Sequence, residues 1–548
     1  MILTRFTIEN FKGIKGPVQI DFKPITLLFG PNSAGKSTIV QALHYALEVL
    51  DRKNFDPGKT AIGGSSLDLG GFESLVANHD LSNNIKLKFD LDIEREDLPV
   101  YFDLYEGFGQ YHFMDESPTW KIPARAKSAW IEVSLGWSYQ LNYPIAKSYK
   151  IGLNGYGLAE IKTTDDGKQA FLDDFNPLHP IFLESLTIDQ ALTIFEKRFV
   201  KKENVDPEDI EKLGPMMDLF FRAFKCDSGF PGLTCPIPLD IQMSAIPIWG
   251  KTLFFDEGVW VEDVDYMDQG SIIVCLSSLI VGPGELVRDE LRRLLYLGPI
   301  REIPSRNYSP EKSPDPSRWA SGMMGWDILF QSEEAFVEKV NRWLTQQGRL
   351  DSGYSIRLKR FREINLDDPV MLLLADGAGL EEMEAIQTRI AAMPVKRRLT
   401  IIEEATGVEL MPQDIGVGIS QVLPVIVGAL HIKNGIFAIE QPELHIHPAL
   451  QVALGDLFIS QIQEKDVMFL LETHSEHLML RLLRRIRETG ANELEPGKWP
   501  LTPEQLAVYY VEQGKNGVTL TQLRVDTEGE FVDRWPKGFF SERMKELF

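Results

Sequence analysis

The sequence predicts an α/β fold in which the two ends of the chain build one sheet and a long segment is inserted between them. Three observations favour this fold. A strand-like apolar run at 25–29 is followed by a glycine-rich loop and then by a helical pattern. Two further apolar runs, at 435–439 and 467–471, lie late in the chain, and both end in carboxylates. Runs that are apolar throughout are typical of strands buried in a parallel sheet.

The loop after the first strand has the sequence GPNSAGKS at residues 30–37, which fits the pattern G-x-x-x-x-G-K-[ST]. In such a loop, successive backbone N–H groups at a helix N-terminus point at the phosphates of a nucleotide. We expect Lys36 to neutralise phosphate charge and Ser37 to hold Mg²⁺. The sequence therefore predicts that the protein binds a nucleoside triphosphate.

The late strands supply the other groups that phosphate chemistry needs. Glu440 lies at the mouth of the strand at 435–439, where it can hold the hydration shell of Mg²⁺. His474 follows the strand at 467–471, from which it could contact the γ-phosphate. Two glycines and a serine at 416–420 precede an apolar helix and make a second anion site. We expect that second site to close over the nucleotide of another copy of the chain.

Histidines near these strands also have the spacings found in zinc sites. No cysteine accompanies them, so we regard zinc binding as the minor alternative. The four residues are His445, His447, His474 and His477.

Composition narrows the classes of function. A chain of 548 residues with 44% apolar and 25% charged residues describes a globular protein with large cores. No apolar run approaches the ~18 residues of a membrane span, and the first residues do not have the layout of a signal peptide, so we expect a cytoplasmic protein with no membrane contact. The formal charge of −23 counts against broad nucleic-acid binding, although basic patches occur at 197–202, 357–362, 396–398 and 481–487.

The chain is expected to divide into four segments. Residues 1–95 form the first part of the nucleotide-binding head, and residues 96–285 form an inserted α+β region with hairpins before residue 180 and helices at 181–225. Residues 286–410 form a second part with a helical and β lid. Residues 411–548 complete the head.

Four motifs together resemble the ABC-type ATPases of the SMC, RecF and OLD group: GPNSAGKS, GVGISQVLPV, FAIEQPELHIHP and ETHSEHL. The resemblance implies an ABC-type P-loop ATPase head with ATP and Mg²⁺ as cofactors, and dimers in which ATP is sandwiched between the P-loop of one head and the signature loop of the other. It also implies the roles of individual residues. Phosphates and Mg²⁺ would be held by Asn32, Ser33, Ala34, Gly35, Lys36, Ser37 and Thr38, with Glu440 as the Walker B acid, His474 as the switch histidine, Gly418 and Ser420 acting in trans, and Lys12 near the nucleotide.

One position departs from the pattern of that group. The pattern has two acids before the proline, and the second polarises the attacking water, whereas this chain has Gln441 there. Glutamine can orient water but cannot accept its proton, and a general base contributes roughly 10²- to 10⁴-fold. We therefore expect slow hydrolysis and a long-lived ATP-bound dimer, unless Glu443 or a partner supplies the base.

The segment WPKGFF at 535–540 is similar to the carboxy-terminal region of bacterial ATPases related to the Septu anti-phage ATPase PtuA, including retron-associated forms. This resemblance implies a role in anti-phage defence with an HNH-type, PtuB-like nuclease as partner, and a retron reverse transcriptase or nucleic acid as a further one. Nothing in the chain resembles a nuclease. The alternative is a DNA-repair ATPase of the SMC or RecF kind that clamps DNA, and a transporter ATPase is disfavoured by the large insertion and the degenerate signature loop.

Overall fold

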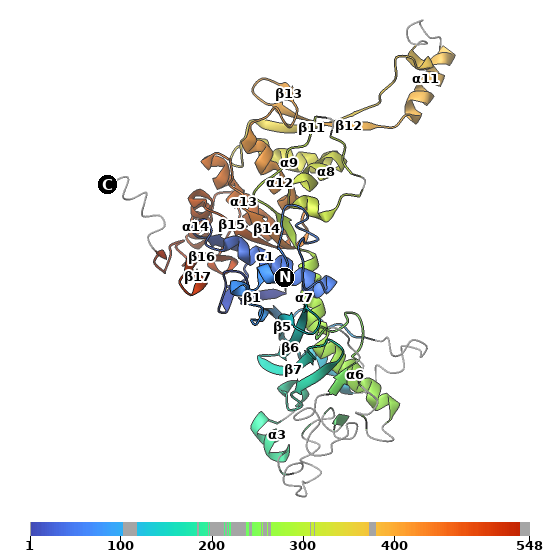
Figure 1. Ribbon diagram of the computed structural model, residues 1–548. Helices are drawn as coiled ribbons and strands as arrows, with labels where there is room; N and C mark the ends of the chain where they lie inside the picture. Colours follow the sequence, from blue (N-terminus) through green and yellow to red (C-terminus); the bar gives the residue numbers. More distant parts are fainter. Residues whose placement is uncertain are drawn as a thin grey trace.

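The computed structural model describes residues 2–101, 118–183, 186–195, 244–253, 265–306, 308–311, 313–371 and 380–536, with scattered positions between 197 and 260. Figure 1 shows the arrangement of these parts. A central sheet lies in the middle of the molecule, a larger sheet lies below it, and a small sheet with a projecting helix lies at the opposite end.

The central sheet has six strands in the order β10-β14-β15-β3-β16-β17. Its neighbours are parallel except β16 and β17, which form a hairpin. The prediction that the two ends of the chain build one sheet is confirmed, because β3 lies between two strands from the last part of the sequence. The strands are β3 (Ile25–Phe29), β10 (Leu295–Leu297), β14 (Asn434–Glu440), β15 (Asp466–Glu472), β16 (Leu506–Gly514) and β17 (Gly517–Gln522).

Strand β3 is buried on both faces, which explains its continuous apolar sequence. Leu28 belongs to the core on one face of the sheet, and Ile25, Leu27 and Phe29 belong to the core on the other. Helices α1 (Lys36–Arg52) and α7 (Gly282–Arg292) contribute to the first core. Helices α8 (Met323–Gln331), α9 (Glu334–Thr345), α12 (Val417–His431), α13 (Pro448–Glu464) and α14 (Glu476–Gly490) contribute to the second.

The second sheet has eight antiparallel strands in the order β2-β1-β4-β5-β6-β7-β8-β9. Strand β4 pairs with β5, so the sheet continues across the boundary predicted at residues 95 and 96, and the insertion begins as an extension of the head. The hairpins predicted before residue 180 are present. The strands are β1 (Leu3–Glu9), β2 (Val18–Asp21), β4 (Ile85–Asp92), β5 (Ser128–Ser138), β6 (Tyr143–Leu153), β7 (Tyr156–Thr163), β8 (Ala170–Phe175) and β9 (Ile237–Leu239).

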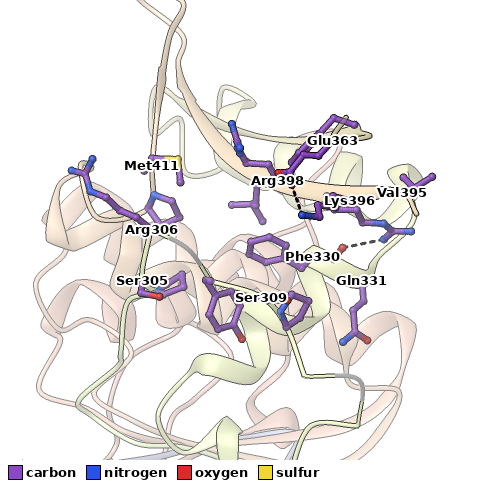
Figure 2. Close-up of a pocket in the computed structure, with 17 residues that line it drawn as sticks. Ser305, Arg306, Ser309, Phe330, Gln331, Glu363, Val395, Lys396, Arg398 and Met411 are labelled. Atoms are coloured by element: carbon purple, nitrogen blue, oxygen red, sulfur yellow. Dashed lines mark hydrogen bonds and ion pairs between the residues drawn. The ribbon is translucent and has the colours of Figure 1, made fainter. Parts of the chain in front are cut away.

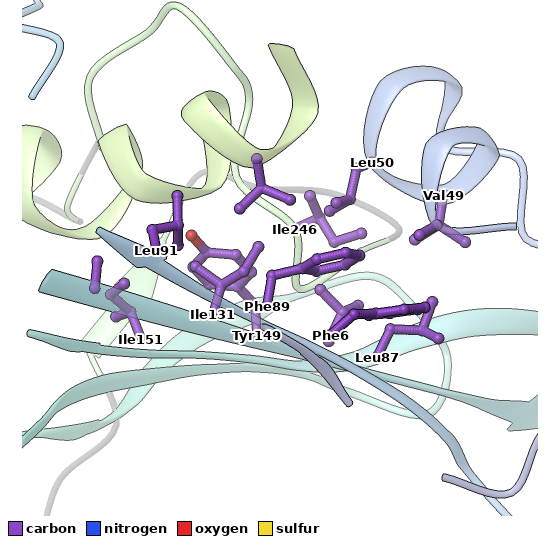
Figure 3. Close-up of a cluster of buried hydrophobic side chains, with 14 of the residues drawn as sticks. Phe6, Val49, Leu50, Leu87, Phe89, Leu91, Ile131, Tyr149, Ile151 and Ile246 are labelled. Carbon is purple, nitrogen blue, oxygen red and sulfur yellow. The ribbon is translucent and has the colours of Figure 1, made fainter. Parts of the chain in front are cut away.

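The first core joins this sheet to the nucleotide-binding part. Phe6 and Phe89 stack with their ring centroids 4.5 Å apart. Val49 and Leu50 of α1 lie over the same sheet face, as Figure 3 shows. A shared core of this kind means that the sheet and α1 are held together by apolar packing.

A third, three-stranded sheet consists of β11 (Tyr354–Phe361), β12 (Lys396–Glu403) and β13 (Val408–Leu410). Helix α11 (Leu380–Ala392) lies between β11 and β12 in sequence and projects from the rest of the molecule (Figure 1). The boundary predicted at residue 286 falls inside α7, which packs on α1. Strand β10 then joins the central sheet, so the segment 286–410 begins inside the head as well.

The segment 181–225 and the WPKGFF motif lie partly outside the described residues. Within 181–225, α3 (Ile188–Phe195) is helical, and most of the remainder lies outside the described residues. Trp535 packs edge-on against Phe29, Tyr510 and Phe531, with centroid separations of 5.8, 6.2 and 5.1 Å. The rest of the WPKGFF motif and the terminal helix expected after it start at residue 537 and lie outside the described residues.

One helical run, Asp268–Arg292, is long and apolar enough by length and composition to cross a membrane. It combines most of α6 (Tyr266–Ile280) with α7. The expectation that no apolar run approaches that length is therefore wrong for this run. In the structure 78% of its apolar window is buried inside the protein, as in a core helix.

Candidate functional site

The loop between β3 and α1 has backbone angles that require its glycines. Gly30 has φ 150°, and a Cβ built there would lie 2.1 Å from the carbonyl oxygen of Val511 on β16. Gly35 has φ 99° and lies close to Val518 on β17. Ser33 also has a positive φ, 61°. The C-terminal hairpin therefore holds the loop from behind, while Pro31, Asn32 and Ser33 remain exposed.

Lys36 begins α1, and its amine folds back onto this loop. The Nζ atom donates to the carbonyls of Gly30 at 3.0 Å and Pro31 at 2.9 Å, and it lies 3.9 Å from Oε1 of Glu472. Burial lowers the pKa of Lys36, and the nearby carboxylates oppose this shift. The residue is 3% exposed, so its charge is shielded from solvent and lies against the loop. This placement fits the predicted role in neutralising phosphate.

Ser37 brings two acidic side chains together. Its hydroxyl donates to Oε2 of Glu472 at 2.7 Å and lies 3.3 Å from Oε2 of Glu440. The two glutamates end neighbouring strands, where they stand directly opposite in the register of β14 and β15. Glu440 is 7% exposed, and Glu472 is 5% exposed. Sequence reasoning singled out Glu440 and missed Glu472, although the acid at the end of the run VMFLLE was a signal of the same kind.

The two carboxylates are buried side by side, and Lys36 is the positive charge that opposes the resulting rise in their pKa values. Burial, together with the charge of Glu472, raises the pKa of Glu440 to about 7, and burial also raises the pKa of Glu472. Tyr296 donates its hydroxyl to Oε1 of Glu440 at 2.9 Å. Carboxylate and hydroxyl oxygens are the ligands that Mg²⁺ accepts, directly or through its waters. Ser37, Glu440 and Glu472 therefore fit a Mg²⁺ ion, which when bound with a nucleotide would neutralise phosphate charge.

Glu443 has a different set of contacts. Its two carboxylate oxygens accept hydrogen bonds from the hydroxyl of Thr473 and the backbone N–H of His474, both at 2.7 Å. Burial raises the pKa of Glu443, and these two hydrogen bonds oppose the rise. In this geometry Glu443 holds the loop that follows β15.

His474 keeps one ring nitrogen without a partner. Its Nε2 is buried and has no hydrogen bond among the described residues. Burial, with a smaller contribution from Lys36, lowers the pKa of His474 and favours the neutral imidazole. A neutral imidazole has one donor and one acceptor nitrogen, and the tautomer that carries its proton on Nε2 can donate to a phosphate oxygen, as the predicted contact requires.

Arg301 links the site to helix α12, and sequence reasoning did not single it out. Its guanidinium donates to the backbone carbonyls of Glu440 at 2.8 Å, Gln441 at 3.1 Å and Gln421 at 3.2 Å. The side-chain amide of Gln421 donates back to the carbonyl of Arg301 at 2.8 Å. Burial lowers the pKa of Arg301 to about 10, so the group stays charged at neutral pH. Gln441 itself has φ 48°, and its N–H donates to the carbonyl of Glu472 at 2.7 Å.

The segment at 416–420, which the sequence predicts to be a signature loop, is closely packed within the chain. The hydroxyl of Ser420 is directed to the carbonyl of Gly416 at 3.4 Å, and the residue is fully buried. A Cβ at Gly418 would lie 2.7 Å from the carbonyl oxygen of His445. The exposed part of the segment is the start of α12, where Val417 is 53% exposed. The action of Gly418 and Ser420 in trans stays a prediction.

Lys12 lies beside α1. Its Nζ donates to the side-chain carbonyl of Gln41 at 2.7 Å, and burial lowers its pKa. The structure thus places Lys12 near the helix that starts at the phosphate loop. Thr38 is the third residue of that helix and is half-buried. In the part of the chain that the structure describes, no group of three or more His, Cys, Asp or Glu side chains is arranged to hold a metal ion, so the zinc alternative gains no support.

The glycine loop, the buried carboxylates and the sheet order define an α/β P-loop ATPase head. Family models agree with this class. A model described as "AAA domain" matches residues 5–222, and one described as "AAA ATPase domain" matches residues 339–479. A third, described as "Protein of unknown function (DUF3696)", matches residues 501–548. The chain therefore carries AAA-type ATPase sequences in two parts, separated by an intervening region.

Solved structures of SMC heads are similar to this chain at low scores. The Smc head domain of Pyrococcus furiosus, bound to the C-terminal domain of ScpA, is 11% identical with a TM-score of 0.36 and covers 100% of this chain and 98% of its own. The Pyrococcus yayanosii Smc head is 9% identical, with a TM-score of 0.37 and coverages of 100% and 99%. The Thermotoga maritima SMC head is 9% identical, with a TM-score of 0.34 and coverages of 96% and 100%. A search of curated proteins gave no match.

Proposed function

We propose that this protein is an ABC-type ATPase of the SMC, RecF and OLD kind, which dimerises around Mg²⁺ and ATP and hydrolyses the ATP slowly. The carrying observation is the contact of Ser37 with both Glu440 and Glu472 at the mouth of the sheet, beside Lys36. Positioning and charge neutralisation account for most of the catalysis of phosphoryl transfer. These four residues supply both functions.

Slow hydrolysis is supported by the residues around Gln441. Glutamine stands where a general base is expected, and Glu443 already accepts two hydrogen bonds from the loop of His474. Glu472 is adjacent but is engaged with Ser37. No carboxylate is left over in this group as an evident base for the attacking water.

Replacing Gln441 by Glu is expected to accelerate single-turnover hydrolysis by roughly 10²- to 10⁴-fold, because the new carboxylate can accept a proton. The measurement is release of labelled phosphate from enzyme in excess over ATP. Gln347→Glu makes the same change at an exposed position in the turn that follows α9 and serves as the control. Rapid wild-type turnover with no acceleration by Gln441→Glu would contradict the proposal.

Dimerisation is supported by the exposed start of α12 and the unpartnered Nε2 of His474, both suited to a phosphate bound at an interface. Val417→Glu places a negative charge at this helix N-terminus and is expected to prevent ATP-dependent dimers while leaving ATP binding intact. Val532→Glu, at an exposed position elsewhere, is the matched control. The measurement is the molar mass by light scattering with and without ATP. An ATP-dependent dimer in the Val417→Glu variant would contradict the proposal that ATP lies between the two heads.

We further propose that the ATP-bound dimer controls a partner HNH-type nuclease in anti-phage defence. The support is the likeness of WPKGFF to PtuA-related ATPases, together with the absence of nuclease motifs from the sequence. The proposal expects a gene for such a nuclease beside the gene for this protein. Co-expression of both should reduce phage plating, and Lys36→Ala should abolish the protection. Full protection by the Lys36→Ala protein would show that defence does not depend on ATP binding.

An SMC-like ATPase that clamps DNA is the alternative function, and ATP-dependent binding of duplex DNA would favour it.

A further inference from the structure

A cavity of about 690 Å³ lies between the β11–β12 ribbon and residues 304–306 and 308–310, away from the P-loop. Figure 2 shows Phe330 at its floor, Arg398 and Lys396 from β12 above, and Arg306 at one side. It shares no residue with the P-loop, the two buried glutamates or Arg301. Its size is within the ~300–1,000 Å³ typical of ligand sites.

The ribbon beside this cavity is strongly basic, although the chain has a formal charge of −23. The register places Lys359 opposite Arg398 and Arg360 opposite Arg397. Like charges directly opposite each other on paired strands are destabilising. A bound polyanion would remove this repulsion. The basic residues of the ribbon and its ends are Arg357, Lys359, Arg360, Arg362, Lys396, Arg397 and Arg398.

Acidic partners neutralise only part of this charge. Glu409 on β13 pairs with Arg357 at 2.9 Å and Lys359 at 2.5 Å. Lys396 pairs with Glu363. Arg360 and Arg398 are exposed and have no ion pair among the described residues. Two guanidinium groups are thus available to an external anion.

The lining of the cavity is aromatic as well as basic. The guanidinium of Arg398 lies 4.9 Å from the ring centroid of Phe361. Tyr308 and Phe330 form a tilted pair with centroids 5.3 Å apart. Aromatic rings and arginine planes beside phosphate-binding cations are the features on which unpaired bases stack. A base within a duplex would first have to leave its stack, which costs free energy.

We propose that the β11–β12 ribbon and its cavity bind single-stranded nucleic acid, with Arg398 on a phosphate and a base beside Phe361 at the cavity. Arg360, which the register places on the other face of the ribbon, contacts a further phosphate at the edge strand β11. This site is independent of ATP chemistry at the P-loop. The ribbon attracts the phosphates electrostatically, and the aromatic rings of the cavity stack on a base. Both kinds of contact tolerate any base, so we expect only a weak preference for nucleotide sequence.

The test uses the full chain and fluorescence anisotropy of a labelled oligothymidylate of about 20 nucleotides, with the matching duplex in parallel. Single strands should bind more tightly than the duplex. The double variant Arg360→Ala, Arg398→Ala should weaken binding at least tenfold at low salt and reduce the slope of log affinity against log salt by about 1.4, because each single-strand phosphate contact contributes ~0.7. Lys150→Ala with Lys162→Ala is the control, since it removes two lysines from the β6–β7 pair without affecting the ribbon.

A second pair of variants separates stacking from charge. Phe361→Leu should weaken binding of the oligonucleotide by about five- to 150-fold, and Phe361→Tyr should restore it. The melting temperature of the Arg360→Ala, Arg398→Ala variant should not fall below the wild-type value, since each substitution relieves one like-charge pair. Equal binding of duplex and single strand, or equal losses in the Lys150 and Lys162 control, would overturn the proposal. Tight binding of free mononucleotide with no gain for the oligonucleotide would overturn it as well.

Discussion

Glu472→Gln is expected to lower kcat for ATP hydrolysis by about 10²- to 10³-fold, the size of effect seen when one preorganised electrostatic contact is removed. The reason is that Glu472 makes the shorter of the two contacts to Ser37 and stands beside Lys36. The dependence of the rate on Mg²⁺ concentration should also move to higher Mg²⁺, because a carboxylate has been lost from the group that fits the ion. Glu440→Gln should show the same two changes.

Glu493→Gln is the matched control, because it neutralises an exposed acid that follows α14. A melting curve without nucleotide excludes unfolding as the cause. Since each Gln variant removes one of two adjacent buried negative charges, its melting temperature should not fall. An unchanged kcat in Glu472→Gln would show that Glu472 is a structural acid and that Mg²⁺ is held by Ser37 and Glu440 without it.

Arg301→Met is expected to lower the free energy of unfolding by about 3 kcal/mol, because it removes three hydrogen bonds from a charged group, each worth about 1.5–3 kcal/mol, while it relieves the cost of burying that charge. The three acceptors belong to Glu440, Gln441 and Gln421, so the change also releases α12 from the end of β14. Urea denaturation followed by tryptophan fluorescence measures the first effect. ATP-dependent dimerisation measures the second.

Arg301→Lys provides a sharper comparison. Lysine keeps the positive charge but cannot reach several carbonyls with a planar fork. It should recover part of the stability while dimerisation stays impaired. Arg524→Met is the control, because that arginine is exposed and its ion pair with Asp533 is of the kind worth at most about 1 kcal/mol. Wild-type dimerisation by both Arg301 variants would show that the contact to α12 is not used.

Local patterns were sufficient to predict the parts of the site that are continuous in sequence. The strand, loop and helix around Lys36 follow from residue order alone, and Glu440 follows from the end of an apolar run. Glu472 has the same sequence signal, but its contact with Ser37 depends on β15 lying next to β3, which periodicity does not specify. Arg301 follows a short three-residue strand and acts on carbonyls, so no side-chain motif marks it.

The domain boundaries show the same limit. The rise in aromatic residues, prolines and glycines after residue 97 predicts a boundary between residues 1–95 and 96–285. The pairing of β4 with β5 overrides that change in composition. Strand pairing depends on contacts between residues far apart in the sequence. Because of this pairing, the first half of the insertion belongs to the same sheet as β1.

The position of β3 has a consequence for how the protein is made. Ser37 and Glu472 are separated by 435 positions in the chain. At ~5–20 residues per second, the ribosome needs ~20–90 s to deliver the second after the first. During that interval the apolar strand ITLLF lacks both neighbours and presents two open edges, the state in which chains associate wrongly. We expect slow folding, dependence on chaperones during synthesis, and an aggregated product when translation stops before β15.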